Sequence, residues 1–341
     1  MRSKIIALAA VPLLALLAAC TSSGSAATSG SASASASAGS AGADTTSAGH
    51  KSYTIYFAPE AVPNSFWAPM KAGALAAAKV TGNKVVWTEG TSFDTQATAQ
   101  RIQVAIASHP DALVVTDLVP SAFDPLMAKA RAQGIPVFDS NAQSTSANPP
   151  YLMYFGANET AAGQLAGKQL MASGKITRVM CGIVDITSAA LAQRCAGLAS
   201  VLTPAGIQVD KVDVSGSPSE ITAKVQAYFT AHPTTNGVYL TAADPTWLKP
   251  LMTVVGGLSH HVAVISNDNS PLALQQIQSG KMTGTIIQQQ YLQGYLPVIY
   301  ADLYLRYGFL PATNKIYTGP FFVNKKNAAS ISSLVQQGIQ G

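Results

Sequence analysis

The stretch ALVVTDLVPSAFDPLMAKARAQGIPVFD, residues 112–139, carries the pattern that decides the fold. An apolar, β-branched run at 112–116 is followed by a helical stretch at 123–133, which Gly134 closes, and by a second apolar run at 135–138. Short buried strands that alternate with helices are typical of parallel βαβ units. The stretch therefore predicts an α/β fold with a parallel sheet.

The same alternation extends along the chain in both directions. Residues 106–115 and 229–238 also resemble each other, because each breaks a helix at His-Pro before a strand. The region from residue 51 onward is larger than one average domain, so we expect two similar α/β lobes. The other expected strands are 53–57, 84–87, 178–184, 209–214, 238–241 and 262–266, and the other expected helices are 66–80, 96–108, 161–173 and 189–202.

Polar and aromatic side chains follow many of the expected strands. In an open parallel sheet, ligands bind beyond the carboxyl ends of the strands. Carboxylates and amides hydrogen-bond hydroxyl groups, and an aromatic face covers the apolar face of a ring, so these loops suit a neutral, polyhydroxylated ligand. The loop positions include Asn64, Phe66, Trp67, Asp117, Asp139, Asn141, Asp185, Asp244, Asn267, Asp268, Asn269 and Gln288.

Several ordered motifs between residues 53 and 327 resemble the sugar-binding periplasmic proteins of the ribose-binding type. This family has the type I fold and serves ABC importers. The resemblance implies two Rossmann-like lobes with parallel sheets and a three-crossing hinge. The motifs are Asn64-Ser-Phe-Trp67, Gly134-Ile-Pro-Val-Phe-Asp139, Val264-Ile-Ser-Asn-Asp268, Thr283-Gly-Thr-Ile-Ile-Gln288 and Thr318-Gly-Pro320.

The resemblance also implies where the lobes divide. The crossings are expected near Gly156, Gln289 and Ile316. The N-lobe would then comprise 51–156 plus 289–316, and the C-lobe 157–288 plus 317–341.

Ligand contacts follow from the same resemblance. Asn64, Asp139, Asp268 and Gln288 would hydrogen-bond the ligand, and an aromatic pair, Phe66 and Trp67, would stack on its ring. The structural alternative for each is a turn, helix-cap or core role.

Two departures from the family pattern bear on the ligand. Ala192 stands where the family places an arginine, which leaves Gln193 and Arg194 as the candidates to replace it. Ala243 stands in place of an asparagine, although Asp244 is retained, and Trp247 is a candidate to enter the site from the same loop. The ligand class therefore stays open between a standard pentose or hexose and a deoxy sugar, a nucleoside-like molecule or another small polar compound.

The N-terminal residues predict export. Two basic residues precede an apolar run at 5–17, which is shorter than the roughly 20 residues of a membrane-spanning helix, so residues 1–19 are expected to be a signal peptide. Leu17-Ala18-Ala19-Cys20 resembles the lipobox of bacterial lipoproteins, which implies a lipidated Cys20. The alternative is a plain secretory signal with an unrelated cysteine.

Residues 20–50 are almost only Ser, Ala, Gly and Thr after the cysteine, so they predict a disordered tether. The protein is expected to be lipid-anchored at the outer face of the cytoplasmic membrane, or on the periplasmic side in a Gram-negative cell.

The remaining cysteines, Cys181 and Cys195, lie on an expected strand and on the helix that follows it. In an oxidising compartment they are candidates for a disulfide, the alternative being two buried free thiols. No His or third Cys has a spacing suited to zinc, so no metal site is expected.

The sequence lacks the marks of several other functions. It contains no His-Glu-x-x-His, Gly-x-Ser-x-Gly or P-loop motif, so we expect neither an enzyme nor a cofactor. Its cations are scattered, which argues against nucleic acid as a partner. We expect a monomeric solute-binding lipoprotein of an ABC importer that delivers a sugar-like ligand to a permease. The alternative is a sensory lipoprotein of the same fold that acts on a membrane receptor.

Overall fold

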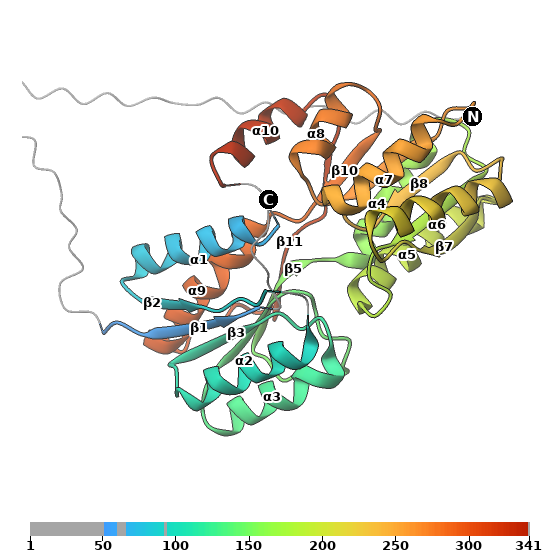
Figure 1. The fold of residues 1–341 in the computed structure, drawn as a ribbon. Helices are drawn as coiled ribbons and strands as arrows, with labels where there is room; N and C mark the ends of the chain where they lie inside the picture. Colours follow the sequence, from blue (N-terminus) through green and yellow to red (C-terminus); the bar gives the residue numbers. More distant parts are fainter. Residues whose placement is uncertain (1–50, 60–65, 92–93, 340–341) are drawn as a thin grey trace, which may run out of the picture. The chain divides into compact units, whose positions relative to one another are not determined.

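The computed structural model describes residues 51–59, 66–91 and 94–339 (Figure 1). These residues form two six-stranded sheets, in the orders β11-β5-β4-β3-β1-β2 and β12-β10-β9-β8-β6-β7. Counted in chain order, the first five strands of each sheet lie in the doubly wound order 2-1-3-4-5. The described part of the chain is therefore an α/β structure with two lobes of one topology, which confirms the predicted fold class.

The strands are short, and those at the centre of each sheet are buried along their whole length. This explains their continuous apolar runs, because parallel sheets are covered on both faces. All neighbours are parallel except β12, which runs antiparallel to β10. The strands are β1 (Thr54–Ala58), β2 (Lys84–Trp87), β3 (Ala112–Val115), β4 (Val137–Asn141), β5 (Met153–Ala157), β6 (Arg178–Ile183), β7 (Gln208–Asp213), β8 (Gly237–Leu240), β9 (Ala263–Asn267), β10 (Gly284–Ile287), β11 (Lys315–Gly319) and β12 (Phe321–Val323).

Helices cover both faces of each sheet. In the N-lobe, α1 and α9 pack on one face and α2 and α3 on the other (Figure 1). In the C-lobe, α4 and α5 share one apolar core with the sheet, and α6, α7, α8 and α10 share another. The helices are α1 (Trp67–Thr81), α2 (Thr95–Ala107), α3 (Pro120–Ala132), α4 (Glu159–Ala172), α5 (Ala189–Leu202), α6 (Pro218–Ala231), α7 (Pro245–Gly256), α8 (Pro271–Gln278), α9 (Gln290–Tyr307) and α10 (Ala328–Gln336), with a short 3₁₀ turn at Thr203–Ala205.

Glycines bring one helix pair of each lobe close together. A Cβ built on Gly73 of α1 or Gly294 of α9 would overlap the backbone of the other helix. The same holds for Gly163 of α4 and Gly197 of α5. Only glycine permits so close an approach, so both lobes repeat one packing device as well as one strand order.

The chain passes between the two sheets at three places. The first lies between β5 and α4, and the second between β10 and α9. The third follows Gly319, later than the expected position near Ile316, because β11 runs on beside β5 until Gly319 is level with Ala157. We use N-lobe for the described residues of 51–157 and 290–319, and C-lobe for those of 158–288 and 320–339.

Cys181 on β6 and Cys195 on α5 form a disulfide, with their Cα atoms 5.9 Å apart. Both residues are fully buried. The bond ties the first strand of the C-lobe to the helix that carries Arg194. Among the described residues, no helix has the length and apolar character needed to cross a membrane.

Candidate functional site

A cavity of about 510 Å³ is lined by residues of both lobes. Phe66, Trp67, Leu118 and Asn141 come from the N-lobe. The rest of the wall comes from C-lobe segments that follow β6, β7, β8, β9 and β10, together with Glu159 at the start of α4 and the first turns of α5 and α7. The cavity therefore lies where the carboxyl ends of parallel strands place a ligand.

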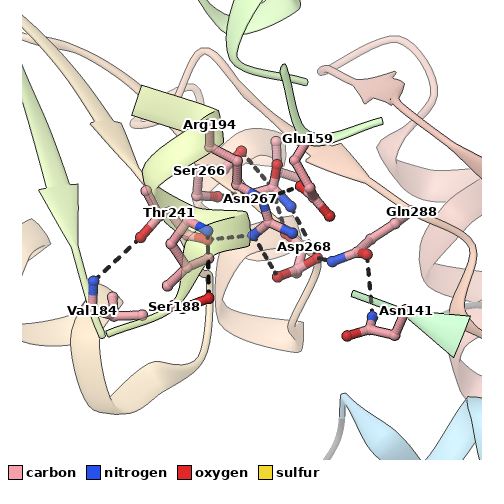
Figure 2. A network of polar contacts seen from close by, with 12 residues as sticks. Asn141, Glu159, Val184, Ser188, Arg194, Thr241, Ser266, Asn267, Asp268 and Gln288 are labelled. Atoms are coloured by element: carbon pink, nitrogen blue, oxygen red, sulfur yellow. Dashed lines mark hydrogen bonds and ion pairs between the residues drawn. The ribbon is translucent and has the colours of Figure 1, made fainter. Parts of the chain in front are cut away.

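A buried arginine organises the C-lobe side of this cavity (Figure 2). The Arg194 Nε donates to Glu159 Oε2 at 2.5 Å, and Nη1 donates to the carbonyl oxygen of Thr241 at 2.7 Å. The same Nη1 lies 3.7 Å from Asp268 Oδ2. All three charged side chains are buried, so the guanidinium and the two carboxylates fix one another's positions.

The charges of this group are mutually dependent. Burial disfavours the charge on Arg194, but the neighbouring carboxylates of Glu159 and Asp268 outweigh it and raise the arginine pKa. Burial also raises the pKa of Asp268, an effect that the Arg194 charge and the hydrogen bond from Gln288 oppose. The cation is therefore permanent, and each carboxylate is held beside it in a region of low polarity.

Gln288 extends the group into the N-lobe. Its Nε2 donates to Asp268 Oδ1 at 2.5 Å, and its Oε1 accepts from Asn141 Nδ2 at 3.3 Å. Asn141 Nδ2 also donates to Gln293 Oε1 on α9 at 2.9 Å. Figure 2 shows Gln288 between Asp268 and Asn141. One line of polar side chains thus joins Arg194 in the C-lobe to Asn141 in the N-lobe.

Backbone conformation turns several of these side chains toward the cavity. Asn141, Asp268 and Gln289 have φ values of 73°, 69° and 55°. Positive φ is uncommon outside glycine, although Asn and Asp tolerate it better than other residues. The two of these residues that line the cavity are an Asn and an Asp, each at or directly after the end of a strand. Such strain is often found at ligand sites.

Asn269 adds a hydrogen-bond donor that is not used. It follows Asp268, lines the cavity and is buried, and its Nδ2 has no hydrogen-bond partner among the described residues. Buried amides are nearly always satisfied, so an acceptor on a ligand would complete this group. The sequence places Asn269 in a loop after a strand, but it carries no signal that separates it from its neighbours.

Most of the side chains predicted as ligand contacts line this cavity. They are Phe66, Trp67, Arg194, Asp244, Trp247, Asp268 and Gln288. Their contact with a ligand stays a prediction. Of the two candidates to replace the missing family arginine, Arg194 reaches this cavity and Gln193 does not. Asn64 and Cys20 lie outside the described residues.

Asp139 is the exception among the described candidates. It is fully buried, and its carboxylate accepts from the backbone N–H groups of Asp117 at 3.2 Å and Ser144 at 3.4 Å. Because β4 continues as far as Asn141, Asp139 lies inside the sheet and Asn141 occupies the strand end at the cavity. Asn141 therefore lines the cavity, and Asp139 does not.

Apolar side chains line the cavity on the side of each lobe. Phe66 and Trp67 pack edge to face at the start of α1, with ring centroids 4.9 Å apart. On the C-lobe side, Ala243 is fully buried in the apolar core, and Trp247 is partly buried and packs against that core. Described residues contain no group of three or more His, Cys, Asp or Glu side chains suited to a metal ion.

The fold and the cavity together define the type I class of periplasmic binding proteins. The chain belongs to the family described as periplasmic binding protein domain, whose model matches residues 55–308. A curated relative, the xylose/arabinose-binding protein XylF of Sulfolobus acidocaldarius, is 30% identical over 300 residues, which are 82% of this chain and 72% of the relative.

Solved structures agree with this assignment. A carbohydrate transporter from Acidothermus cellulolyticus, in complex with myo-inositol, is 28% identical with a TM-score of 0.76 over 85% of this chain and 100% of its own. An ABC transporter solute-binding protein from Agrobacterium vitis, bound with alpha-D-tagatopyranose, has a TM-score of 0.75 over 85% of this chain and 99% of its own. At 23% identity, the second likeness shows the fold alone. The homologues are thus sugar-binding proteins of transporters rather than enzymes.

Proposed function

We propose that this chain is the solute-binding lipoprotein of an ABC importer and that it binds a sugar-like polyol in the cavity. The observation that carries the proposal is the line of buried polar side chains from Arg194 through Asp268 and Gln288 to Asn141, which borders a cavity lined by both lobes. Such a line offers both acceptors and donors to a ring of hydroxyl groups.

The chemistry of binding follows from these groups. The Asp268 carboxylate would accept from ligand hydroxyls, and Asn269 Nδ2 and the amides of Asn141 and Gln288 would donate to them or accept from them. Phe66 and Trp67, at the N-lobe side, would cover an apolar face of the ring. XylF is a xylose/arabinose-binding protein and the Acidothermus structure holds myo-inositol, and these ligands are ring polyols of this kind.

A ligand that contacts both lobes would favour their closed arrangement, with the three crossings as the hinge. The closed, monomeric protein would then deliver the ligand to a membrane permease. The sensory alternative needs the same cavity, so it differs only in the partner. Genes for a permease and an ATPase beside this one would support import, whereas a neighbouring receptor kinase would support sensing.

The anchor is tested separately from the cavity. A lipidated Cys20 would hold the protein at the outer face of the cytoplasmic membrane, or on the periplasmic side in a Gram-negative cell, on the tether of residues 20–50. Replacing the thiol, as in Cys20→Ala, should release the protein from isolated membranes into the soluble fraction. If the variant still sediments with membranes, the lipoprotein assignment is wrong.

The binding proposal is tested by thermal unfolding and calorimetry with a panel of pentoses, hexoses and cyclitols. A ligand at 100 times its dissociation constant should stabilise the protein by about 2.7 kcal/mol. Asp268→Asn retains a residue that tolerates the positive φ but removes the carboxylate, and should weaken binding about 10- to 100-fold.

Glu220→Gln is the matched control, because Glu220 is an exposed capping residue of α6 that glutamine can replace. Its affinity should equal that of the unmodified protein. Absence of any polyol ligand, or full affinity in Asp268→Asn, would contradict the proposal.

A further inference from the structure

The C-lobe wall of the cavity contains apolar side chains as well as the line of polar side chains. Six residues form it, from the loop after β6, the start of α5, the loop after β8 and the start of α7. We name this set the apolar wall: Val184, Ile186, Leu191, Ala242, Ala243 and Trp247.

The apolar wall is anchored in the C-lobe core but reaches solvent. Val184 and Ala243 belong to the buried core, and Leu191, Ala242 and Trp247 pack against it. Ile186 is 64% exposed, a large fraction for an isoleucine at the edge of a cavity. Covering such side chains with an apolar group removes them from water, which is favourable in proportion to the area buried.

Polar side chains on the same wall are already occupied by local hydrogen bonds. Asp185 Oδ1 accepts from both the backbone N–H and the hydroxyl of Thr187, at 2.9 and 2.7 Å. Asp244 Oδ1 accepts from the backbone N–H of Thr246 at 2.9 Å, where it caps α7. Among the buried side chains that line the cavity in the described residues, Asn269 is the one whose polar atom, Nδ2, has no hydrogen-bond partner, so a ligand hydroxyl is better served there, beside Asp268 and Gln288.

We infer that the ligand is a ring polyol that carries one apolar substituent, such as a methyl, O-methyl or aryl group. This inference rests on the function proposed above. The hydroxyl-bearing edge lies against the polar line, and the substituent lies against the apolar wall. A cavity of about 510 Å³ falls within the roughly 300–1,000 Å³ of small-molecule sites, so it has room for a ring and a substituent.

The test compares matched ligand pairs by calorimetry on the purified full chain in detergent. The pairs are myo-inositol with its mono-O-methyl ethers, and D-xylose with its methyl and phenyl glycosides. Each buried CH₂ should tighten binding about 4-fold, so a substituted member of at least one pair should bind at least 10-fold more tightly than its parent.

A variant links the preference to the wall. Ile186→Ser should lower the affinity ratio between the substituted and parent ligands by at least 4-fold, and its exposure makes a folding defect easy to avoid. Val104→Ser is the control, because Val104 is 63% exposed on α2, outside the cavity wall. Its ratio should be unchanged.

The outcomes separate the two proposals. If parent polyols bind as tightly as their substituted partners, or if Ile186→Ser leaves the affinity ratio of substituted to parent ligand unchanged, the inference of an apolar substituent is wrong. The proposed polyol-binding function would still stand. If neither member of any pair binds, both proposals are overturned.

Discussion

At the scale of single residues, a carboxyl cluster beneath the loop after β4 is as notable as the cavity. Asp117 and Asp139 are buried, and Ser144 and Ser146 donate to the nearby Asp124. Burial, followed by the neighbouring Asp124, raises the pKa of Asp117 to about 8. Burial and the charge of Asp117 raise the pKa of Asp139 in the same direction. The folded protein therefore holds a proton that the unfolded chain releases at much lower pH.

The sign of the resulting pH dependence follows from proton linkage. Between the ordinary aspartate pKa of about 3.9 and about 8, the folded state binds more protons than the unfolded state, so stability falls as pH rises. Asp117→Asn removes one of these groups. In thermal unfolding from pH 5 to 8.5, the midpoint temperature of the variant should rise relative to that of the unmodified protein as pH increases.

Asp213→Asn is the control for this titration. Hydrogen bonds from Ser215 lower the pKa of Asp213 to about 2. Its stabilising contribution is complete above the ordinary aspartate pKa and is lost only as pH falls toward 2, so the midpoint difference should stay constant from pH 5 to 8.5. If the midpoints of Asp117→Asn and the unmodified protein differ by a constant amount across this pH range, the pKa of Asp117 is not raised in the folded protein.

At the scale of helices and strands, close helix pairing positions the charged group of the cavity. Glu159 begins α4 and Arg194 lies on α5. A Cβ on Gly163 would overlap the backbone oxygen of Arg194 and come within 2.7 Å of the Leu198 nitrogen. Gly163 therefore sets the separation of the two helices whose side chains form the buried ion pair.

Gly163→Ala should therefore cost about 1–3 kcal/mol of stability by overpacking, and it should weaken ligand binding by displacing Arg194. Chemical denaturation and calorimetry measure the two effects. Gly256→Ala is the control, since Gly256 ends α7 and a Cβ there meets nothing within 4 Å. It should match or slightly exceed the stability of the unmodified protein. Equal stability in both variants would refute the packing argument.

At the scale of the whole molecule, the cavity depends on both lobes. Asn141 ends β4 of the N-lobe, whereas Asp268 follows β9 of the C-lobe, and Gln288 hydrogen-bonds to both. A ligand held by this line would stabilise two sheets that share no strand pairing.

Hydrogen exchange with and without a polyol ligand tests this dependence on both lobes. Bound ligand should slow exchange in β4 and in β10, one from each lobe. Helix α6 supplies no residue to the cavity wall and should exchange at an unchanged rate. Protection confined to one lobe would show that the ligand does not join them.

Much of this architecture is predictable because it depends on local patterns. Apolar runs such as 112–116, separated by helical stretches that end at glycine, specify parallel βαβ units wherever they occur. The candidate disulfide partners, Cys181 and Cys195, could also be named from the sequence, because they lie on an expected strand and on the helix that follows it.

The position of the third crossing could not be predicted in this way. The length of β11 depends on its pairing with β5, which lies about 160 residues earlier in the chain.

What the sequence alone determined is the alternation of strands and helices, the two-lobed α/β class and the loops in which the site residues lie. Tertiary structure decided which of those residues face the cavity. Asp139 and Asn141 belong to one strand, yet Asp139 is buried inside the sheet, whereas Asn141 lies at the carboxyl end of the strand and lines the cavity. Likewise Arg194 is drawn to Glu159, 35 residues away, rather than to its own neighbours. Burial and ion pairing are set by non-local contacts, and periodicity along the chain does not encode them.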